Sequence, residues 1–293
     1  MEVFKGSGTA TVTPFNGDGS VNFSALGKLI DFQIQNKTDA IIVCGTTGEA
    51  STLTDDEQIE TIRFAVDAVK KKVPVVAGAG SNDTEHGVQL SKRCMQAGAD
   101  ALLLVTPYYN KTTQKGLVEH YTKHALAVDL PIIVYNIPGR TGLNITPKTA
   151  KILSGIDNIA GVKEASGNIV QIAEIAELCG DDLALYAGND DYVVPVLSLG
   201  GKGVISTAGN IIPRQMHDLV EKFFEGDLKG SLAIQLGMLE LIRALFCEVN
   251  PIPIKRALNF MGMNAGGYRA PLTSMEPQNE KLLKEAMTRY GLI

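Results

Sequence analysis

A lysine follows an apolar run directly in the stretch IAGVKEASGN (159–168). The residues from Ile159 to Val162 are typical of a buried β-strand, and Lys163 stands at its end. Burial removes the hydration of a charged amine and therefore lowers its pKa. The side chain could extend its charged end into water, which is the common behaviour of lysine. It could instead stay partly neutral and attack a carbonyl group.

The same pattern recurs eight times along the chain: a short apolar run, a turn and, in most cases, an amphipathic stretch. The runs are 8–15, 40–48, 73–80, 99–109, 131–138, 159–166, 183–190 and 203–210. Nearly continuous apolar runs indicate parallel strands that are buried on both faces. The stretch 55–72 has helical spacing, and Thr54 and Glu57 predict a capping box at its start.

Eight strand–helix units in succession predict an α/β fold, a (β/α)8 TIM barrel, over residues 1–224. A doubly wound open sheet is the alternative. It would need a glycine-rich loop that opens a helix after the first strand, and residues 15–20 lack that context. No strand-like run follows residue 225, whereas 229–247, 252–262 and 276–290 have helical patterns. We therefore expect residues 225–293 to form a C-terminal helical domain.

Polar side chains gather at the predicted C-terminal ends of the strands, where barrel enzymes place their active sites. These residues are Thr13, Thr46, Thr47, Tyr108, Tyr109, Tyr135, Lys163, Asn189 and Ser206. A lysine among hydroxyls and phenols favours the nucleophile over the solvent-exposed cation. An amine that forms a Schiff base with a ketone allows a carbanion to form at the adjacent carbon. Tyr135 and Thr46 could move the protons that such a reaction requires.

Two further motifs could bind carboxylates. In GTTGEAS (45–51), backbone N–H groups and the hydroxyls of Thr46 and Thr47 suit an anion, although the motif alone could be an ordinary glycine turn. Arg140, in NIPGRTG (136–142), could bind a second carboxylate through two nitrogens. A surface ion pair is the alternative for this arginine, but Pro138 and Gly139 favour a shaped loop.

The motifs give no indication of a metal or a cofactor. The chain has no P-loop, dinucleotide-binding or GxSxG motif. All four histidines fall in predicted helices, and we expect no metal site at the strand ends. His120 and His124 have the spacing of a helical metal pair but lack a third ligand nearby in sequence, so we predict a solvent-exposed helix face.

The composition limits the partners and the location of the protein. A net charge of −5 without a long Lys/Arg cluster argues against a nucleic-acid or membrane partner. Four widely spaced cysteines fit a reducing compartment. The sequence has neither the apolar core of a signal peptide nor an apolar run of membrane-spanning length, so we expect a cytoplasmic protein.

The motifs, taken in order, resemble those of the dihydrodipicolinate synthase family. The motifs are GTTGE (45–49), TPYYN (106–110), YNIPGRTG (135–142), GVKEASGN (161–168), GNDD (188–191), NPIPIKRAL (250–258) and RAPL (269–272). Single motifs are shared with other pyruvate-dependent class I aldolases, but the combination is specific and covers essentially the whole chain. The resemblance implies a barrel with a C-terminal helical domain that assembles as a homotetramer, a dimer of dimers. It also implies a lyase that condenses pyruvate with L-aspartate 4-semialdehyde to give 4-hydroxy-tetrahydrodipicolinate, in the diaminopimelate route of lysine biosynthesis.

The resemblance also implies catalytic roles, position by position. Lys163 matches the Schiff-base lysine of the family. Tyr135 matches the tyrosine that transfers protons together with Thr46 and Tyr109. In the family, the counterpart of Tyr109 reaches across from the neighbouring subunit.

Three further positions match substrate-binding residues. Thr47 matches a residue that binds the pyruvate carboxylate, and Arg140 matches the one that orients the carboxylate of the semialdehyde. Ile205 matches a position whose backbone carbonyl lies near the Schiff base. Glu164 receives no role, and we interpret it as a local structural partner.

Two other functions compete with the synthase. The first is a sister lyase such as an N-acetylneuraminate lyase or a keto-deoxy sugar acid aldolase. Sialic acid lyases tend to carry serine at the position of Thr46 and no arginine after the NIP stretch, so Thr46 and Arg140 favour the synthase. The second is a non-catalytic barrel that senses 2-oxo acids, which should have lost some of these side chains. All of them are present.

Overall fold

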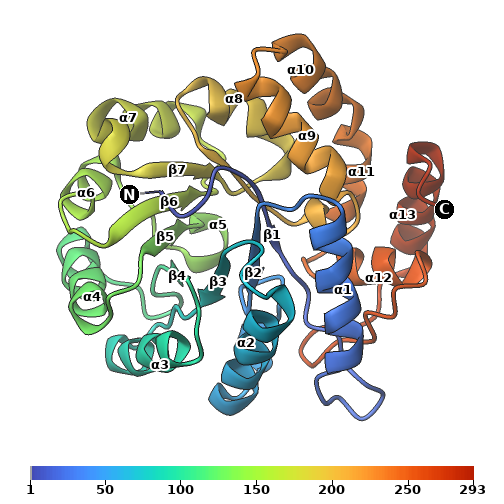
Figure 1. The fold of residues 1–293 in the computed structure, drawn as a ribbon, viewed down its shortest axis with the longest axis horizontal. Coiled ribbons are helices and arrows are strands. Elements are labelled where there is room, and N and C mark those ends of the chain that lie inside the picture. The colour runs from blue at the N-terminus through green and yellow to red at the C-terminus, as the bar shows by residue number, and fades with distance from the viewer. Residues whose placement is uncertain (1) are drawn as a thin grey trace.

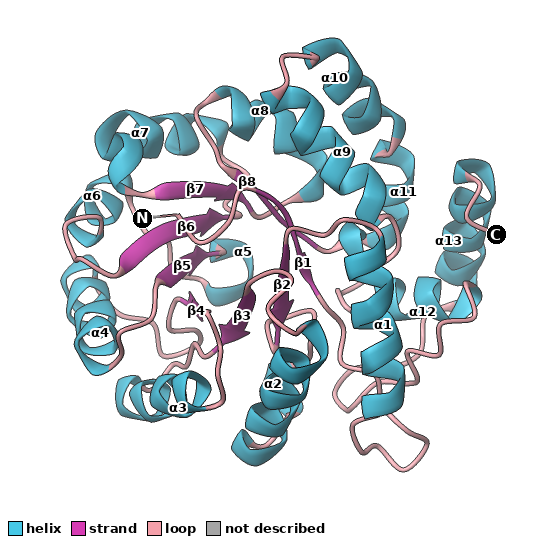
Figure 2. Cartoon of the chain, in the orientation of Figure 1, coloured by secondary structure: helices cyan, strands magenta, loops and turns pink. Residues whose placement is uncertain are grey.

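The eight apolar runs form a closed barrel of parallel strands, and helices surround it (Figures 1 and 2). The computed structural model describes residues 2–293. The strands are β1 (Gly6–Ala10), β2 (Ala40–Val43), β3 (Val75–Gly78), β4 (Ala101–Val105), β5 (Ile132–Asn136), β6 (Ile159–Glu164), β7 (Ala184–Ala187) and β8 (Gly203–Ser206). Each strand pairs with the next, and β8 pairs with β1 to close the barrel. The predicted TIM barrel is confirmed.

The position of the first strand was predicted incorrectly. The apolar run 8–15 starts too late, because Gly6 and Ser7 already pair with β8 although neither is apolar. The run also extends too far, since β1 ends at Ala10. Beyond it, the side-chain hydroxyl of Thr13 donates to the backbone oxygen of Gly48 at 2.6 Å. The chain after β1 thus crosses toward the loop that follows β2.

Helices connect the strands and continue after the last one. They are α1 (Phe23–Gln35), α2 (Asp55–Val69), α3 (Thr84–Gln96), α4 (Gln114–Ala127), α5 (Pro138–Thr141), α6 (Pro147–Leu153), α7 (Ile169–Cys179), α8 (Val193–Ser198), α9 (Pro213–Phe224), α10 (Leu228–Gly237), α11 (Leu239–Leu245), α12 (Ile252–Phe260) and α13 (Pro277–Tyr290). The capping box of α2 is confirmed: the side chain of Thr54 accepts from the backbone of Glu57, and Glu57 accepts from the backbone of Thr54. The helix ends earlier than predicted because Lys70 has a left-handed backbone, with φ of 54°.

Two hydrophobic cores hold the barrel together. The larger lies between the strands and the surrounding helices, and the smaller fills the inside of the barrel with residues such as Leu103, Ile133 and Tyr186. Phe4 precedes β1 and stacks on Tyr186 with ring centroids 4.6 Å apart. The Tyr186 hydroxyl also donates to the backbone oxygen of Phe4. This packing closes the N-terminal end of the barrel, so a cavity can open only at the other end.

The C-terminal extension is helical, as expected. Helices α11, α12 and α13 pack against one another, and α12 and α13 are seen at the same side of the barrel as α1 in Figure 1. The predicted segment 229–247 divides into α10 and α11 at Met238. Helix α9 packs against β1 and closes the ring of barrel helices, so a division after residue 224 is our proposal for the domain boundary. Over residues 2–293, no helix combines the length and the apolar character needed to cross a bilayer.

The prediction that His120 and His124 face solvent was wrong, because both side chains are buried. Helix α3 covers this face of α4, so Nδ1 of His120 lies 2.9 Å from the Thr84 hydroxyl. Nδ1 of His124 lies 2.9 Å from the Ser91 hydroxyl. Gly87 allows this approach, since a Cβ there would come within 2.7 Å of the His124 ring. Burial lowers the pKa of His120 to about 4 and that of His124 to about 3, so both rings are neutral at pH 7.

Candidate active site

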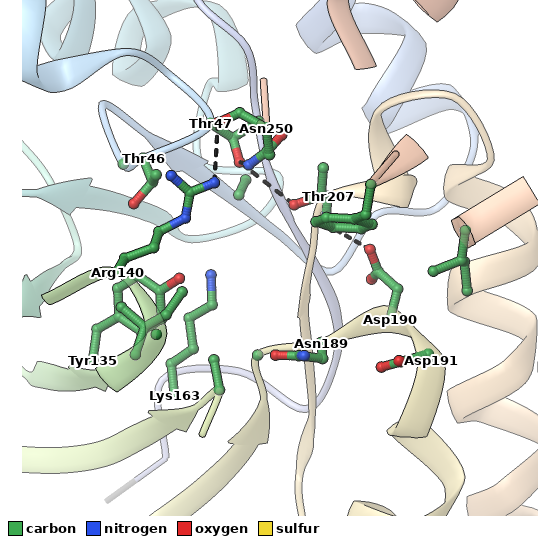
Figure 3. Close-up of a pocket in the computed structure, with 18 of the residues that line it drawn as sticks. Thr46, Thr47, Tyr135, Arg140, Lys163, Asn189, Asp190, Asp191, Thr207 and Asn250 are labelled. Atoms are coloured by element: carbon green, nitrogen blue, oxygen red, sulfur yellow. Dashed lines mark hydrogen bonds between the residues drawn. The ribbon is translucent and has the colours of Figure 1, made fainter. Parts of the chain in front are cut away.

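A cavity of about 680 Å³ opens at the C-terminal ends of the strands (Figure 3). The polar side chains that line it include Thr46, Thr47, Tyr135, Arg140, Lys163, Asn189, Asp190, Asp191, Thr207 and Asn250. In Figure 3, the amine of Lys163 points into the space below the guanidinium of Arg140. Leu239 and Ile242 of α11 and Phe246, which follows this helix, also line the cavity. The barrel and the C-terminal extension therefore both contribute to it.

Lys163 is held inside the barrel by the pairing of β5 with β6. Tyr135 and Lys163 are register partners on these two strands. The Nζ atom lies 4.3 Å from the centre of the Tyr135 ring, and the lysine is 5% exposed. Burial lowers the pKa of Lys163 to about 8, the Asp190 carboxylate opposes this shift, and the Arg140 charge adds to it. Roughly a tenth of the amine is therefore neutral at pH 7.

Tyr135 keeps its proton at neutral pH. Burial raises the pKa of its phenol to about 12, although the Arg140 charge and the Thr46 hydroxyl partly offset this. A protonated phenol can donate a hydrogen bond or a proton to a group at the lysine nitrogen. Because the phenol and the amine lie on adjacent strands, the barrel itself fixes their relative position.

Asp190 is a site residue that the sequence analysis did not identify. It is 2% exposed, and its Oδ2 accepts from the backbone N–H groups of Thr207 and Ala208 at 3.1 and 2.8 Å. Its Oδ1 has no partner within the described residues 2–293. Burial raises the pKa of the carboxyl group. The motif GNDD (188–191) at the end of the seventh run was the available signal, but only Asn189 was selected from it.

A chain of hydrogen bonds joins the two candidate carboxylate sites. The side-chain amide of Asn250 donates to the Thr47 hydroxyl at 2.9 Å, and the Thr47 oxygen lies 3.5 Å from the Thr207 hydroxyl. The guanidinium of Arg140 donates to the backbone oxygen of Asn250 at 3.1 Å. Asn250 and Thr207 were also missed, since they come from segments that are distant in sequence from Thr47. Their convergence depends on the closure of the barrel and on the docking of the extension.

Four of the residues selected from the strand ends do not line this cavity, namely Thr13, Tyr108, Tyr109 and Ser206, and neither does Ile205, which the resemblance indicated. Thr13 and Ser206 are buried, and their hydroxyls are hydrogen-bonded to the backbone of Gly48 and Gly209 respectively. Ile205 packs inside the barrel, and the role of its carbonyl stays a prediction. Tyr109 is 91% exposed in the single chain. Its phenol is therefore available to a neighbouring molecule rather than to its own cavity.

Glu164, which follows the lysine, is fully buried and supports the surrounding backbone. Its carboxylate accepts from the side-chain amide of Asn136 and from the backbone N–H of Ser166, both at 2.7 Å. Burial raises the pKa of the carboxyl group, and these hydrogen bonds oppose the shift. The interpretation of Glu164 as a local structural partner is confirmed.

The cavity offers few groups that could hold a metal ion. In the part of the chain that the structure describes, its lining includes the carboxylates of Asp190 and Asp191 but neither histidine nor cysteine. One group of three possible ligands occurs among residues 2–293, formed by His217, Asp218 and Glu221 on α9. It lies outside the cavity lining, and His217 is already bonded to Asp39 at 3.0 Å. The cavity itself offers an amine, a phenol, hydroxyl groups, a guanidinium and the carboxylates of Asp190 and Asp191.

Comparisons with known proteins agree with this geometry. The model of the dihydrodipicolinate synthetase family matches residues 3–290. The 4-hydroxy-tetrahydrodipicolinate synthase of Lachnoclostridium phytofermentans is 58% identical over the full length of both chains. The crystal structure of dihydrodipicolinate synthase from Aquifex aeolicus has a TM-score of 0.96 and 44% identity, and it covers 99% of each chain. A monomeric dihydrodipicolinate synthase variant has a TM-score of 0.97 and 41% identity, over 99% of this chain and 98% of its own. This chain belongs to the dihydrodipicolinate synthetase family.

Proposed function

We propose that the barrel condenses pyruvate with L-aspartate 4-semialdehyde to give 4-hydroxy-tetrahydrodipicolinate, by way of a Schiff base on Lys163. The enzyme is a lyase of the class I aldolase type, in the diaminopimelate route of lysine biosynthesis. The observation that carries the mechanism is the buried amine of Lys163, which points into the cavity beside the phenol of Tyr135. Full-length relatives with this activity in their names support the reaction.

The reaction begins when the neutral amine attacks the ketone carbon of pyruvate. Loss of water gives the imine, and loss of a proton from the methyl group gives an enamine. The Thr46–Thr47 loop suits the pyruvate carboxylate, because the Thr47 oxygen already accepts from Asn250 and its own proton remains available for donation. The phenol of Tyr135 and the hydroxyl of Thr46 are placed to transfer the protons, and Tyr109 of a neighbouring subunit would complete the relay.

The second substrate binds above the enamine. The guanidinium of Arg140 can hold its carboxylate through two parallel hydrogen bonds. The enamine carbon then attacks the aldehyde and forms the new carbon–carbon bond. The amine of the semialdehyde afterwards displaces Lys163 from the imine, which closes the ring and frees the enzyme.

The rival functions are separated by one turnover experiment. The enzyme should consume pyruvate only when L-aspartate 4-semialdehyde is present. N-acetylneuraminate and keto-deoxy sugar acids are tested in parallel reactions and should not be cleaved. Cleavage of a sugar acid without use of the semialdehyde would support the sister lyase. Binding of pyruvate without any turnover would support the 2-oxo acid sensor.

We also propose a homotetramer, built as a dimer of dimers, and a cytoplasmic location. An exposed phenol at Tyr109 supports assembly, because a neighbouring subunit could use it. A solved relative is a monomeric variant, so the oligomeric state needs its own measurement, for example by sedimentation. The four unpaired cysteines support a reducing compartment.

Arg140→Ala should lower kcat/KM for the semialdehyde about 10- to 100-fold, because a hydrogen bond to a charged group contributes roughly 1.5–3 kcal/mol. Adduct formation with pyruvate should change much less. The Arg140 charge lowers the pKa of Lys163, so the variant holds less neutral amine at a given pH, and the adduct is best compared at pH 9, above the wild-type pKa of about 8. Arg140→Lys, which keeps the charge but loses the paired donors, is the matched control. An equal collapse of adduct formation would instead assign Arg140 to holding the site together through Asn250.

Asp190→Asn should move the acidic limb of pyruvate-adduct formation to lower pH. The Asp190 carboxylate stabilises the protonated amine and so raises the pKa of Lys163. Removal of that charge lowers the pKa, and more amine is neutral at a given pH. The asparagine oxygen can still accept from the backbone of Thr207 and Ala208. The rate of adduct formation from pH 6 to 9 is the measurement, and Asp191→Asn, at an exposed neighbour, should shift the limb less. A limb that moves to higher pH would contradict the assigned direction.

A further inference from the structure

We propose that the buried ion pair between Lys255 and Glu49 positions the Thr46–Thr47 loop to bind the pyruvate carboxylate. Lys255 belongs to α12 of the C-terminal extension, whereas Glu49 ends the GTTGE motif of the barrel. The pair would make the extension a working part of the active site. This inference rests on the proposed function, because it assigns a purpose to the loop that binds pyruvate.

The two charges are enclosed by protein. The Nζ atom of Lys255 lies 2.7 Å from Oε1 of Glu49, and the side chains are 0% and 2% exposed. The same amine donates to the backbone oxygen of Thr13 at 2.9 Å and lies 4.2 Å from the centre of the Phe15 ring. The other carboxylate oxygen of Glu49 accepts from the backbone N–H of Arg269 at 3.2 Å. The extension thus holds the carboxylate of Glu49 from two of its own segments.

Because the side chain of Glu49 is fixed, its backbone in turn restrains the Thr46–Thr47 loop. Glu49 has a left-handed conformation, with φ of 55°, which is uncommon for a residue with a side chain and needs support from its surroundings. Its N–H donates to the backbone oxygen of Thr46 at 3.1 Å. The backbone oxygen of Gly48 accepts from the Thr13 hydroxyl at 2.6 Å. A shift of Glu49 would therefore move Thr46 and Thr47 directly.

Asn250, which precedes α12, contacts the same loop independently of the ion pair. Asn250 donates to the Thr47 hydroxyl, and its backbone oxygen accepts from Arg140. A segment of six residues, Asn250–Lys255, thus touches the loop at both Thr47 and Glu49. The two contacts lie two residues apart in the TTGE turn, so they fix its orientation as well as its position.

Stability alone is a poor explanation for the pair. Desolvation of two charges can cost more than their attraction returns, and apolar replacements of a buried pair are often neutral or stabilising. Removal of only one partner leaves an uncompensated buried charge and is strongly destabilising. Replacement of both charges by apolar side chains therefore separates the effect on folding from the effect on the loop.

The test is the double variant Glu49→Leu/Lys255→Met, compared with the wild type. We expect its thermal midpoint to stay close to the wild-type value, while KM for pyruvate rises about tenfold or more. kcat at saturating pyruvate should fall by a smaller factor, because the enamine chemistry on Lys163 is intact. Glu49→Gln keeps an oxygen that accepts from Lys255 but leaves the lysine charge unpaired, so it should lower the thermal midpoint while KM stays closer to the wild type. Glu240→Gln/Arg289→Gln removes an exposed ion pair within the same extension and serves as the matched control.

Each outcome of this test either supports or overturns the positioning role of the ion pair. A wild-type KM and wild-type adduct yield in the double variant would overturn the positioning role. Failure of the double variant to fold would assign the pair to folding and overturn the proposal as well. Borohydride trapping of the wild type is run in parallel. If the wild type forms no adduct on Lys163, the proposed function fails, and this inference fails with it for that separate reason.

Discussion

Replacement of Lys163 with Ala should abolish the covalent pyruvate adduct and lower kcat by at least about 10³-fold, because the variant has no amine for the covalent route. Incubation with pyruvate, reduction with borohydride and peptide mass mapping should place the wild-type adduct on Lys163 alone. The only other lysine classed as buried among residues 2–293 is Lys255, and its amine is occupied by Glu49 and Thr13. Hydration stabilises the charged form of an amine, which is not nucleophilic, so the lysines outside the core are poorer candidates.

Lys163→Met is the control for folding, since it fills nearly the same volume without a charge. A buried amine with a pKa lowered to about 8 binds fewer protons than the same lysine in the unfolded chain. At pH values below about 8 the folded state must therefore bury a charged amine, which lowers the free energy of unfolding, and methionine removes this cost. We expect Lys163→Met to unfold at the wild-type temperature or above it, yet to be inactive. An adduct on another lysine, or a Lys163→Met protein that retains turnover, would contradict the assigned nucleophile.

The sequence predicted the barrel well because parallel buried strands leave a strong pattern of continuous apolar runs. It failed where neighbours from another segment determine burial. The buried face of α4 includes Leu117, Tyr121 and Ala125, and His120 and His124 continue the same helical stripe. That periodicity was present in the sequence. We did not assign the two histidines to this buried face because histidine is polar. The hydroxyls that hydrogen-bond to the two rings lie on a different helix, α3, so the sequence of α4 does not show them.

The candidate site was predictable to the extent that single strands carry it. Lys163, Tyr135 and the two threonines follow from strand ends, whereas Asp190 and Asn250 act through contacts with distant segments. Asn250 meets Thr47 across 203 positions of sequence, and Lys255 meets Glu49 across 206. No pattern within either segment of the sequence predicts such a contact. The role that we propose for Lys255 in NPIPIKRAL (250–258) therefore could not be predicted from the sequence, where 252–262 indicated only a helix.

Tyr109→Phe should lower kcat by roughly 10²- to 10⁴-fold, the usual range for the loss of a proton-transfer group. Tyr109 lies on the loop between β4 and α4, with φ of 70° and 91% of its surface exposed. The loop is nevertheless tied down: Asn82 donates to the backbone oxygen of Tyr108, and Asn110 donates to that of Asn82. A phenol held outward on an anchored loop is suited to complete the cavity of a neighbouring subunit.

Chain mixing tests this arrangement directly. In a hybrid dimer of Tyr109→Phe and Lys163→Ala chains, the first chain keeps its lysine and receives an intact tyrosine from the second. Random reassortment makes about half of the dimers hybrid, with one complete site in each, so activity should return to about a quarter of the wild-type value. In a parallel mixture of Tyr109→Phe/Lys163→Ala with wild-type chains, reassortment should lower the activity from half to about a quarter of the wild-type value, because these hybrids contain no complete site. Native mass spectrometry verifies that hybrids form. If verified hybrids of the two single variants stay inactive, the phenol serves its own chain, and the loop would have to fold inward from the exposed position that it occupies here.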